Sequence, residues 1–312
     1  MHRNGKTIRY PPAVEIGSTA IKLIQLAKTS LGYEIAEIAY WPLPLEGQTP
    51  LTVRDQLKKL IEDRKITGPV VTSLPLNKVQ TLSFVLPNMP EGEMEQAIIW
   101  KLKSNVPGGL RFEEISFDYV PWVSSRPKAR SGEGFRSEGD SDHQEIRVLV
   151  FVAAKGVVME HLKLFRDLKL EPTAIEPKPY ACLEALWGSD QLPQDQTLMV
   201  LQLGASHSSL AILYRGYPFL IKPLGICGHT LTQAIAHYHK LDIKKAEDLK
   251  RQHGSSQSIC WPAISSQIEN LIVEIEHTSR SFSQQIESSS VAYNRMILCG
   301  GSSALPNLAA FL

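Results

Sequence analysis

Apolar residues recur with two different spacings along this chain, and the alternation of these spacings predicts a mixed α/β protein. Short apolar runs bounded by Gly, Pro or polar residues predict strands in these ranges: 13–26 (two strands around a Gly-Ser-Thr turn), 69–75, 79–87, 113–123, 147–154, 171–177, 200–213 and 295–299. Spacings of three and four predict helices in these ranges: 51–66, 90–107, a segment ending near Leu168, 179–187, 228–241, 243–252 and 264–287.

One design occurs twice. Residues 13–26 and 200–213 each consist of an apolar strand, a glycine, a small polar turn and a second apolar strand. Each turn alone is weak evidence, because ordinary hairpins also use Gly and Ser. Since Gly17 and Gly204 each lie near the start of one half of the chain, the pair predicts two similarly built lobes that face one another.

A different module is expected within the first lobe. The strands and helices from 77 to 171 follow the order β-α-β-β-α, and they contain the polar stretch 124–145, which predicts a disordered loop. The expected division is therefore a first lobe of residues 1–76 plus 172–195, an inserted subdomain at 77–171 and a second lobe at 196–312.

The composition narrows the function classes. Lys and Arg number 33 and Asp and Glu 32, so no net charge draws the chain to nucleic acid. The four cysteines are scattered without a C-x-x-C pair, which predicts reduced thiols and no zinc site. Neither an N-terminal apolar segment nor a run of about 18 apolar residues is present, so we expect a soluble, cytoplasmic protein.

Glycine turns are the strongest candidates for chemistry. Glycine lets the backbone approach a ligand closely, and consecutive N–H groups can bind a phosphate. The turns at Gly17, Gly204 and Gly300 are therefore candidate nucleotide contacts. Glu247 and Lys250 share one helix face, so they could hold a nucleoside or form an ordinary solvated ion pair. No catalytic residue and no protein metal-ligand set are predicted.

Taken in order, these segments resemble the family of the type IV pilus assembly protein PilM, a branch of the actin-like ATPase superfamily related to the cell-division protein FtsA. The stretches that carry the resemblance are IGSTAIKLIQL, FVLPNMPEGEMEQAIIWKLKSNVP, IEPKPYACLEAL, LGASHSSLAIL, GHTLTQAIA with AEDLK, and CGGSSALPNLAAFL. The resemblance covers residues 13 to 312 without the loop at 124–145, and its specificity lies in the order of the pieces.

This resemblance implies a bilobal actin-like (RNase-H-like) fold with ATP, with or without Mg²⁺, between the lobes. The implied nucleotide-binding residues are Gly17, Ser18, Thr19 and Lys22 in the first hairpin, Gly204, Ala205 and Ser206 in the second, Gly228, Glu247, Lys250, Gly300, Gly301 and Ser302. It also implies a partner: the cytosolic N-terminal peptide of a PilN-like inner-membrane protein, bound beside the inserted subdomain, through which alone the chain would reach the membrane. Self-association is left open.

Three departures from the family pattern modify this expectation. The first-hairpin aspartate is Glu15 and the second is Gln202, which is neutral, so both changes work against a Mg²⁺ site. The family also continues beyond the Gly-Gly helix, so the second lobe is expected to be shortened. We expect at most a weak ATPase. The alternatives are a nucleotide-free scaffold of a type II secretion platform and a sugar-kinase-like phosphotransferase.

Overall fold

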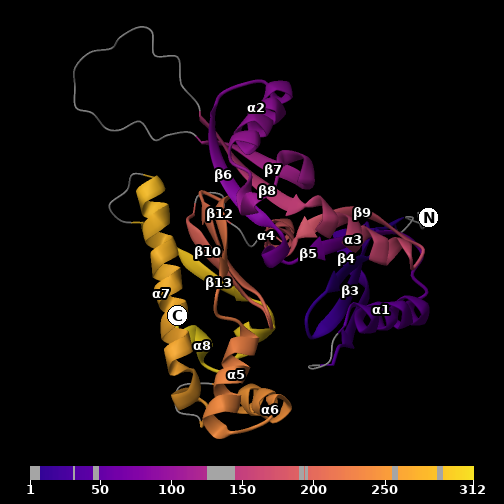
Figure 1. Cartoon of the computed structure of the whole chain (residues 1–312), viewed down its shortest axis with the longest axis vertical. Coiled ribbons are helices and arrows are strands. Elements are labelled where there is room, and N and C mark those ends of the chain that lie inside the picture. The colour runs from indigo at the N-terminus through magenta and orange to yellow at the C-terminus, as the bar shows by residue number, and fades with distance from the viewer. Residues whose placement is uncertain are drawn as a thin grey trace.

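The computed structural model describes residues 8–30, 32–44, 49–124, 145–189, 193, 196–254, 259–286 and 291–312. Within these residues the strands form three sheets, one in the first lobe, one in the module inserted in that lobe and one in the second lobe (Figure 1). The predicted disordered loop at 124–145 falls outside the described residues, except for its two end positions.

A six-stranded sheet in the order β1-β3-β2-β5-β9, with β4 paired to β3, forms the first lobe. Its strands are β1 (Ile8–Arg9), β2 (Ala13–Ile16), β3 (Ala20–Thr29), β4 (Gly32–Pro42), β5 (Gly68–Leu74) and β9 (Leu170–Pro177). β2 and β3 are antiparallel, which confirms the predicted hairpin, while β5 runs parallel to both β2 and β9.

Three helices pack on this sheet or continue from it: α1 (Pro50–Arg64), α3 (Lys155–Arg166) and α4 (Lys178–Gly188). Leu57 and Leu60 of α1 are buried in one apolar cluster with Val14 and Phe165. Phe165 belongs to α3, whose Val157 and Val158 pack on a second cluster that contains Leu149 and Phe151. The helix therefore contacts both the first lobe and the inserted module, because helical spacing defines an apolar face but not the surfaces that it covers.

The third sheet has the strand order β6-β8-β7, and its strands lie in the sequence between β5 and β9 of the first lobe. Its elements are β6 (Gln80–Pro87), α2 (Glu91–Ser104), β7 (Ile115–Ser124) and β8 (Glu145–Ala154), with short 3-10 turns at Leu76–Lys78, Pro107–Gly109 and Phe112–Glu114. Met94, Ile98 and Leu102, which recur at the spacing of four that predicts this helix, are buried against this sheet.

The second lobe carries a four-stranded sheet in the order β12-β11-β10-β13. Its elements are β10 (Leu198–Leu203), β11 (Ser208–Tyr214), β12 (Tyr217–Leu224), α5 (Gly228–His239), α6 (Ile243–His253), α7 (Trp261–Gln285), β13 (Arg295–Cys299), a 3-10 turn at Gly301–Ala304 and α8 (Leu308–Phe311). The buried residues of the long α7 belong to one apolar cluster with residues of this sheet, and Figure 1 shows the helix beside β10 to β13.

The lobes meet in a shared apolar cluster. Leu74 and Leu183 of the first lobe pack with Leu198 and Leu213 of the second. At the edge of this contact the Thr81 hydroxyl of β6 donates a hydrogen bond to the Ile221 carbonyl of β12, at 2.5 Å. The lobes are therefore joined on one side, and the two hairpin turns face each other on the other side.

Candidate functional site

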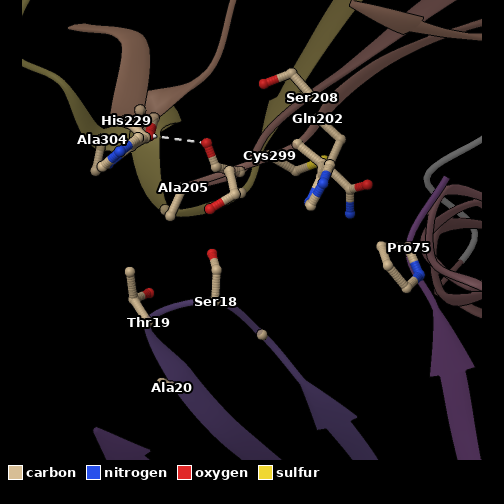
Figure 2. A pocket seen from close by; sticks show the side chains of 18 of the residues that line it. Ser18, Thr19, Ala20, Pro75, Gln202, Ala205, Ser208, His229, Cys299 and Ala304 are labelled. Atoms are coloured by element: carbon tan, nitrogen blue, oxygen red, sulfur yellow. Dashed lines mark hydrogen bonds between the residues drawn. The ribbon is translucent and has the colours of Figure 1, made fainter. Parts of the chain in front are cut away.

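Both lobes line one cavity of about 890 Å³. All fifteen residues that the sequence and the resemblance single out are among those that line it: Glu15, Gly17, Ser18, Thr19, Lys22, Gln202, Gly204, Ala205, Ser206, Gly228, Glu247, Lys250, Gly300, Gly301 and Ser302. Figure 2 shows Ser18 and Thr19 at the tip of one hairpin, opposite Ala205 on the other. Residues from both halves of the sequence are thus assembled around one space, although their role in binding stays a prediction.

The two hairpin turns have the same backbone hydrogen bond. The Gly17 N–H donates to the Ala20 carbonyl at 2.9 Å, and the Gly204 N–H donates to the His207 carbonyl at 3.1 Å. A Cβ atom on Gly17 would lie 2.7 Å from the Ala20 oxygen, and one on Gly204 would collide with the His207 oxygen. Glycine is therefore required at both positions for the close turn itself.

Charged side chains surround the first hairpin. The Glu15 carboxylate lies 3.1 Å from the ammonium groups of both Lys22 and Lys178. Lys178, at the start of α4, also donates to the Ile16 carbonyl at 2.8 Å. Although partial burial works in the opposite direction, the charges of Lys178 and Lys22 hold the pKa of Glu15 below its usual value. The first lobe thus presents two cations and one carboxylate to the cavity, a net positive charge.

Neutral groups occupy the matching places in the second hairpin. Gln202 pairs with Ser209 across β10 and β11, just as Glu15 pairs with Lys22 across β2 and β3. The Ser209 hydroxyl lies 3.5 Å from the Gln202 amide oxygen. The hydroxyl of Ser208, which lines the cavity, is buried with no hydrogen-bond partner among the described residues. A buried orphan hydroxyl in a cavity is a group that a ligand can satisfy.

The beginning of α5 packs directly on the second hairpin. The N–H groups of Gly228 and His229 donate to the Gly204 and Ala205 carbonyls, at 2.9 and 2.6 Å. A Cβ atom on Gly228 would collide with the Ser302 hydroxyl. The N-terminal amides of α5 therefore hold the hairpin in place, and these two are already used by protein carbonyls.

Glu247 and Lys250 of α6 form a buried network behind this helix start. The Lys250 ammonium donates to the Glu247 carboxylate at 2.6 Å, to the Thr232 hydroxyl at 2.8 Å and to the Gly228 carbonyl at 2.9 Å. These three bonds use all three ammonium protons. Burial alone would raise the pKa of Glu247, but its hydrogen bonds to Lys250 and Thr232 lower it to about 2.

This network rules out one of the two interpretations of the pair, the solvated ion pair, and leaves the contact with a nucleoside a prediction. The Lys250 side chain is 7% exposed and that of Glu247 is 15% exposed, so the ion pair is not a solvated surface pair. Lys250 fixes the Gly228 carbonyl at the helix that supports the second hairpin. Glu247 also accepts a bond from the Arg251 guanidinium at 2.9 Å. The pair lines the cavity and positions its wall.

Gly300, which follows the last residue of β13, also lines the cavity. Its φ of +89° is a conformation that side chains disfavour, and an added Cβ would collide with the Leu203 carbonyl oxygen. The turn that follows packs against the same hairpin, since the Ser302 hydroxyl lies 3.3 Å from the Gly204 carbonyl oxygen. Next to Gly301, by contrast, space is open.

The cavity fits a phosphate-bearing ligand better than a divalent cation. The two lysines, the buried Ser208 hydroxyl and the close glycine turns can contact an anion. Glu15 is already paired with two cations, Gln202 carries no charge, and no cluster of three metal-ligating side chains occurs among the described residues. A Mg²⁺ ion prefers carboxylates and water in octahedral geometry, so these residues do not fit it well.

Sequence reasoning missed several residues that line this cavity. Lys178 brackets Glu15 from α4, and its only sequence signal is its place between two prolines after a strand. His207, which belongs to the predicted turn within 200–213 but was not itself a candidate site residue, also lines the cavity, where burial, together with the nearby Lys178 and Lys78, lowers its pKa. Cys182 and Cys299, which appeared scattered, lie with their sulfur atoms 3.5 Å apart.

Comparisons with known proteins agree with this geometry. The family model described as type IV pilus assembly protein PilM matches residues 13–312. A solved PilM–PilN type IV pilus biogenesis complex superimposes with a TM-score of 0.76 at 27% identity, covering 96% of this chain and 84% of that one. The ethanolamine utilization protein EutJ from Carboxydothermus hydrogenoformans gives a TM-score of 0.53 at 12% identity, covering 97% and 80%. Both likenesses indicate the bilobal actin-like fold.

Hydropathy adds one further finding. Among the helices of the described residues, none is both long and apolar enough to cross a membrane.

Proposed function

The chain belongs to the type IV pilus assembly protein PilM family, and on that premise we propose that it binds the cytosolic N-terminal peptide of a PilN-like inner-membrane protein. The observation that carries this proposal is the match to a solved PilM–PilN complex over 96% of the chain. The chain would then be an actin-like scaffold of pilus assembly that reaches the inner membrane through its partner. The family match favours this function over a type II secretion scaffold or a sugar kinase.

We place the peptide beside the third sheet, on α2 and β6. Among the described strands β6 pairs with β8 alone, so its other edge is available for strand addition beyond the Thr81 contact with the second lobe. Val85 of β6 is 41% exposed and Trp100 of α2 is 70% exposed. Exposed tryptophan is a common anchor of binding energy in protein interfaces.

Binding of the synthetic peptide to the full chain tests this proposal. The peptide is the cytosolic N-terminus of the PilN-like protein that is encoded with this chain, and its affinity is measured by calorimetry. We expect Trp100→Ser to weaken binding about tenfold or more, since anchor residues typically contribute about 2 kcal/mol.

The matched control is Tyr238→Ser, because Tyr238 is 56% exposed on α5, away from the third sheet. This variant should bind as the unchanged chain does. Absence of binding by the unchanged chain would refute the partner, whereas binding that is equally tight in both variants would refute only the location.

For the cavity, we propose weak binding of an adenine nucleotide with very slow turnover or none. The net positive first hairpin, the facing glycine turns and the orphan Ser208 hydroxyl support an anionic ligand. The neutral Gln202 argues against efficient hydrolysis. Lys22 and Lys178 would neutralise the charge of the phosphates, and the glycine turns would orient them. A bound Mg²⁺ would add further charge neutralisation, but the residues around the cavity do not form a good site for it. Nucleotide released from the purified, denatured chain gives a first test, and a stoichiometric amount would contradict weak binding.

A further inference from the structure

Two cysteines from different lobes meet at the floor of the cavity. Cys182 lies in α4 of the first lobe and Cys299 ends β13 of the second, 117 positions further along the chain. Their sulfur atoms are 3.5 Å apart, and both side chains are partly exposed and line the cavity. A disulfide bond is about 2.05 Å long, so an approach of about 1.5 Å would join them.

The surroundings of the two thiols are unequal. The contact with Cys299 lowers the pKa of Cys182 although partial burial opposes this shift, while the same contact and burial raise the pKa of Cys299, whose thiol also lies 3.8 Å from the Leu201 carbonyl oxygen. Cys182 is therefore the sulfur that ionises first, and Cys299 is the neighbour that can resolve its oxidised form. Of the other two cysteines, both buried, Cys260 directs its thiol to the Leu249 carbonyl.

We propose that Cys182 and Cys299 form a reversible disulfide bond that fastens the two lobes to each other at the floor of the cavity, with a peroxide as the oxidant. The Cys182 thiolate attacks one peroxide oxygen, the O–O bond breaks, and the second oxygen leaves as water after protonation. Cys299 then attacks the Cys182 sulfenic acid, forms the S–S bond and releases a second water. Two thiols and one hydrogen peroxide thus give one disulfide and two waters, with two electrons passing to the peroxide.

The position of the bond gives it a consequence for the cavity. Cys182 lies one helical turn after Lys178, and Cys299 immediately precedes Gly300, which packs on the end of β10. The bond would fix the end of β13 relative to α4, and with it the distance between the lobes. The oxidised chain would therefore hold the cavity at one opening, and a dithiol reductant would release it.

Treatment of the full chain with hydrogen peroxide, followed by mass spectrometry without reduction, tests the proposal. We expect the mass to fall by two hydrogen atoms and one linked peptide pair to contain Cys182 and Cys299. Because the bond closes a loop of more than 100 residues, we expect the melting temperature of the chain to rise by about 5 °C, reversibly with dithiothreitol.

Cys260→Ser is the matched control, since it should keep both the linked peptides and the thermal shift. Cys299→Ser should lose both and leave Cys182 as a sulfenic acid, which a dimedone probe labels. The mapping on the unchanged chain does not depend on how the variants fold. Recovery of both thiols unmodified, linkage through another cysteine, or linkage between two chains would overturn the proposal.

Discussion

The two hairpins around the cavity have the same backbone turn but differ in charge, since the first is charged and the second neutral. Each turn is closed by the N–H of a glycine and the carbonyl three residues later. The first is flanked by Glu15, Lys22 and Lys178, and the second by Gln202 and Ser209, which are neutral. The difference shows that turn geometry and site charge are set separately, the first by glycine and the second by the residues on the adjoining strands.

This difference in charge affects anion binding and metal-dependent hydrolysis in the cavity differently. The cations near the hairpin turns come from the first lobe, so the charge available to a phosphate does not depend on the second hairpin. A Mg²⁺ ion beside a phosphate is usually held by one or two carboxylates, and the second hairpin supplies a neutral amide in place of a carboxylate. We therefore expect anion binding to be retained and metal-dependent hydrolysis to be impaired.

The largest expected effect concerns the buried lysine that supports the second hairpin. In Lys250→Met, Glu247 keeps its charge without its ammonium partner and the Gly228 carbonyl loses a donor. We expect a loss of about 4 kcal/mol in the free energy of unfolding, measured with a chemical denaturant. The double variant Lys250→Met with Glu247→Leu should recover part of this loss, and failure to recover any would contradict a role of the pair.

Next in size is the steric requirement of the turns. Gly204→Ala should cost about 3 kcal/mol and Gly17→Ala about 2 kcal/mol, because each added Cβ meets a backbone oxygen that cannot move aside. Gly301→Ala is the control within the same cavity, where space is open. Equal losses in all three variants, measured by denaturant unfolding, would mean that the turns do not need glycine for this reason.

Acid should weaken the second lobe through Glu247. Its pKa is about 2 in the folded chain and lies near 4.5 ordinarily, so below pH 5 the unfolded chain binds more protons. The stabilisation is complete above pH 5 and declines as the pH falls toward 2, by up to about 3 kcal/mol. Unfolding curves at a series of pH values should therefore be flatter for Glu247→Gln, and parallel curves for both chains would be inconsistent with this account.

A smaller effect is expected from making the second hairpin resemble the first. Gln202→Asp places a carboxylate opposite Glu15 and should tighten binding of the magnesium–nucleotide complex about tenfold. Gln202→Asn changes the length without the charge and serves as the control. Calorimetric titration of the three chains distinguishes them, and an unchanged affinity in Gln202→Asp would show that charge at this position does not limit the site.

Local sequence patterns predicted the helices, strands and turns, but they did not predict which segments that are distant in the sequence contact one another. The glycine turns and the ranges of helices such as α2 and α6 follow from local spacing alone. Phe165, Lys178 and the Cys182–Cys299 contact depend on which surfaces meet in three dimensions. The periodicity of a single sequence does not specify which surfaces of different helices and sheets contact one another.

Titration of the full chain with ATP by calorimetry, once with Mg²⁺ and once with EDTA, tests the central claim most directly. The account predicts weak binding whose affinity is little changed by the metal, together with negligible phosphate release. An affinity raised about tenfold or more by Mg²⁺, or sustained magnesium-dependent phosphate release, would contradict it, because the neutral second hairpin would then be no obstacle to a working metal site.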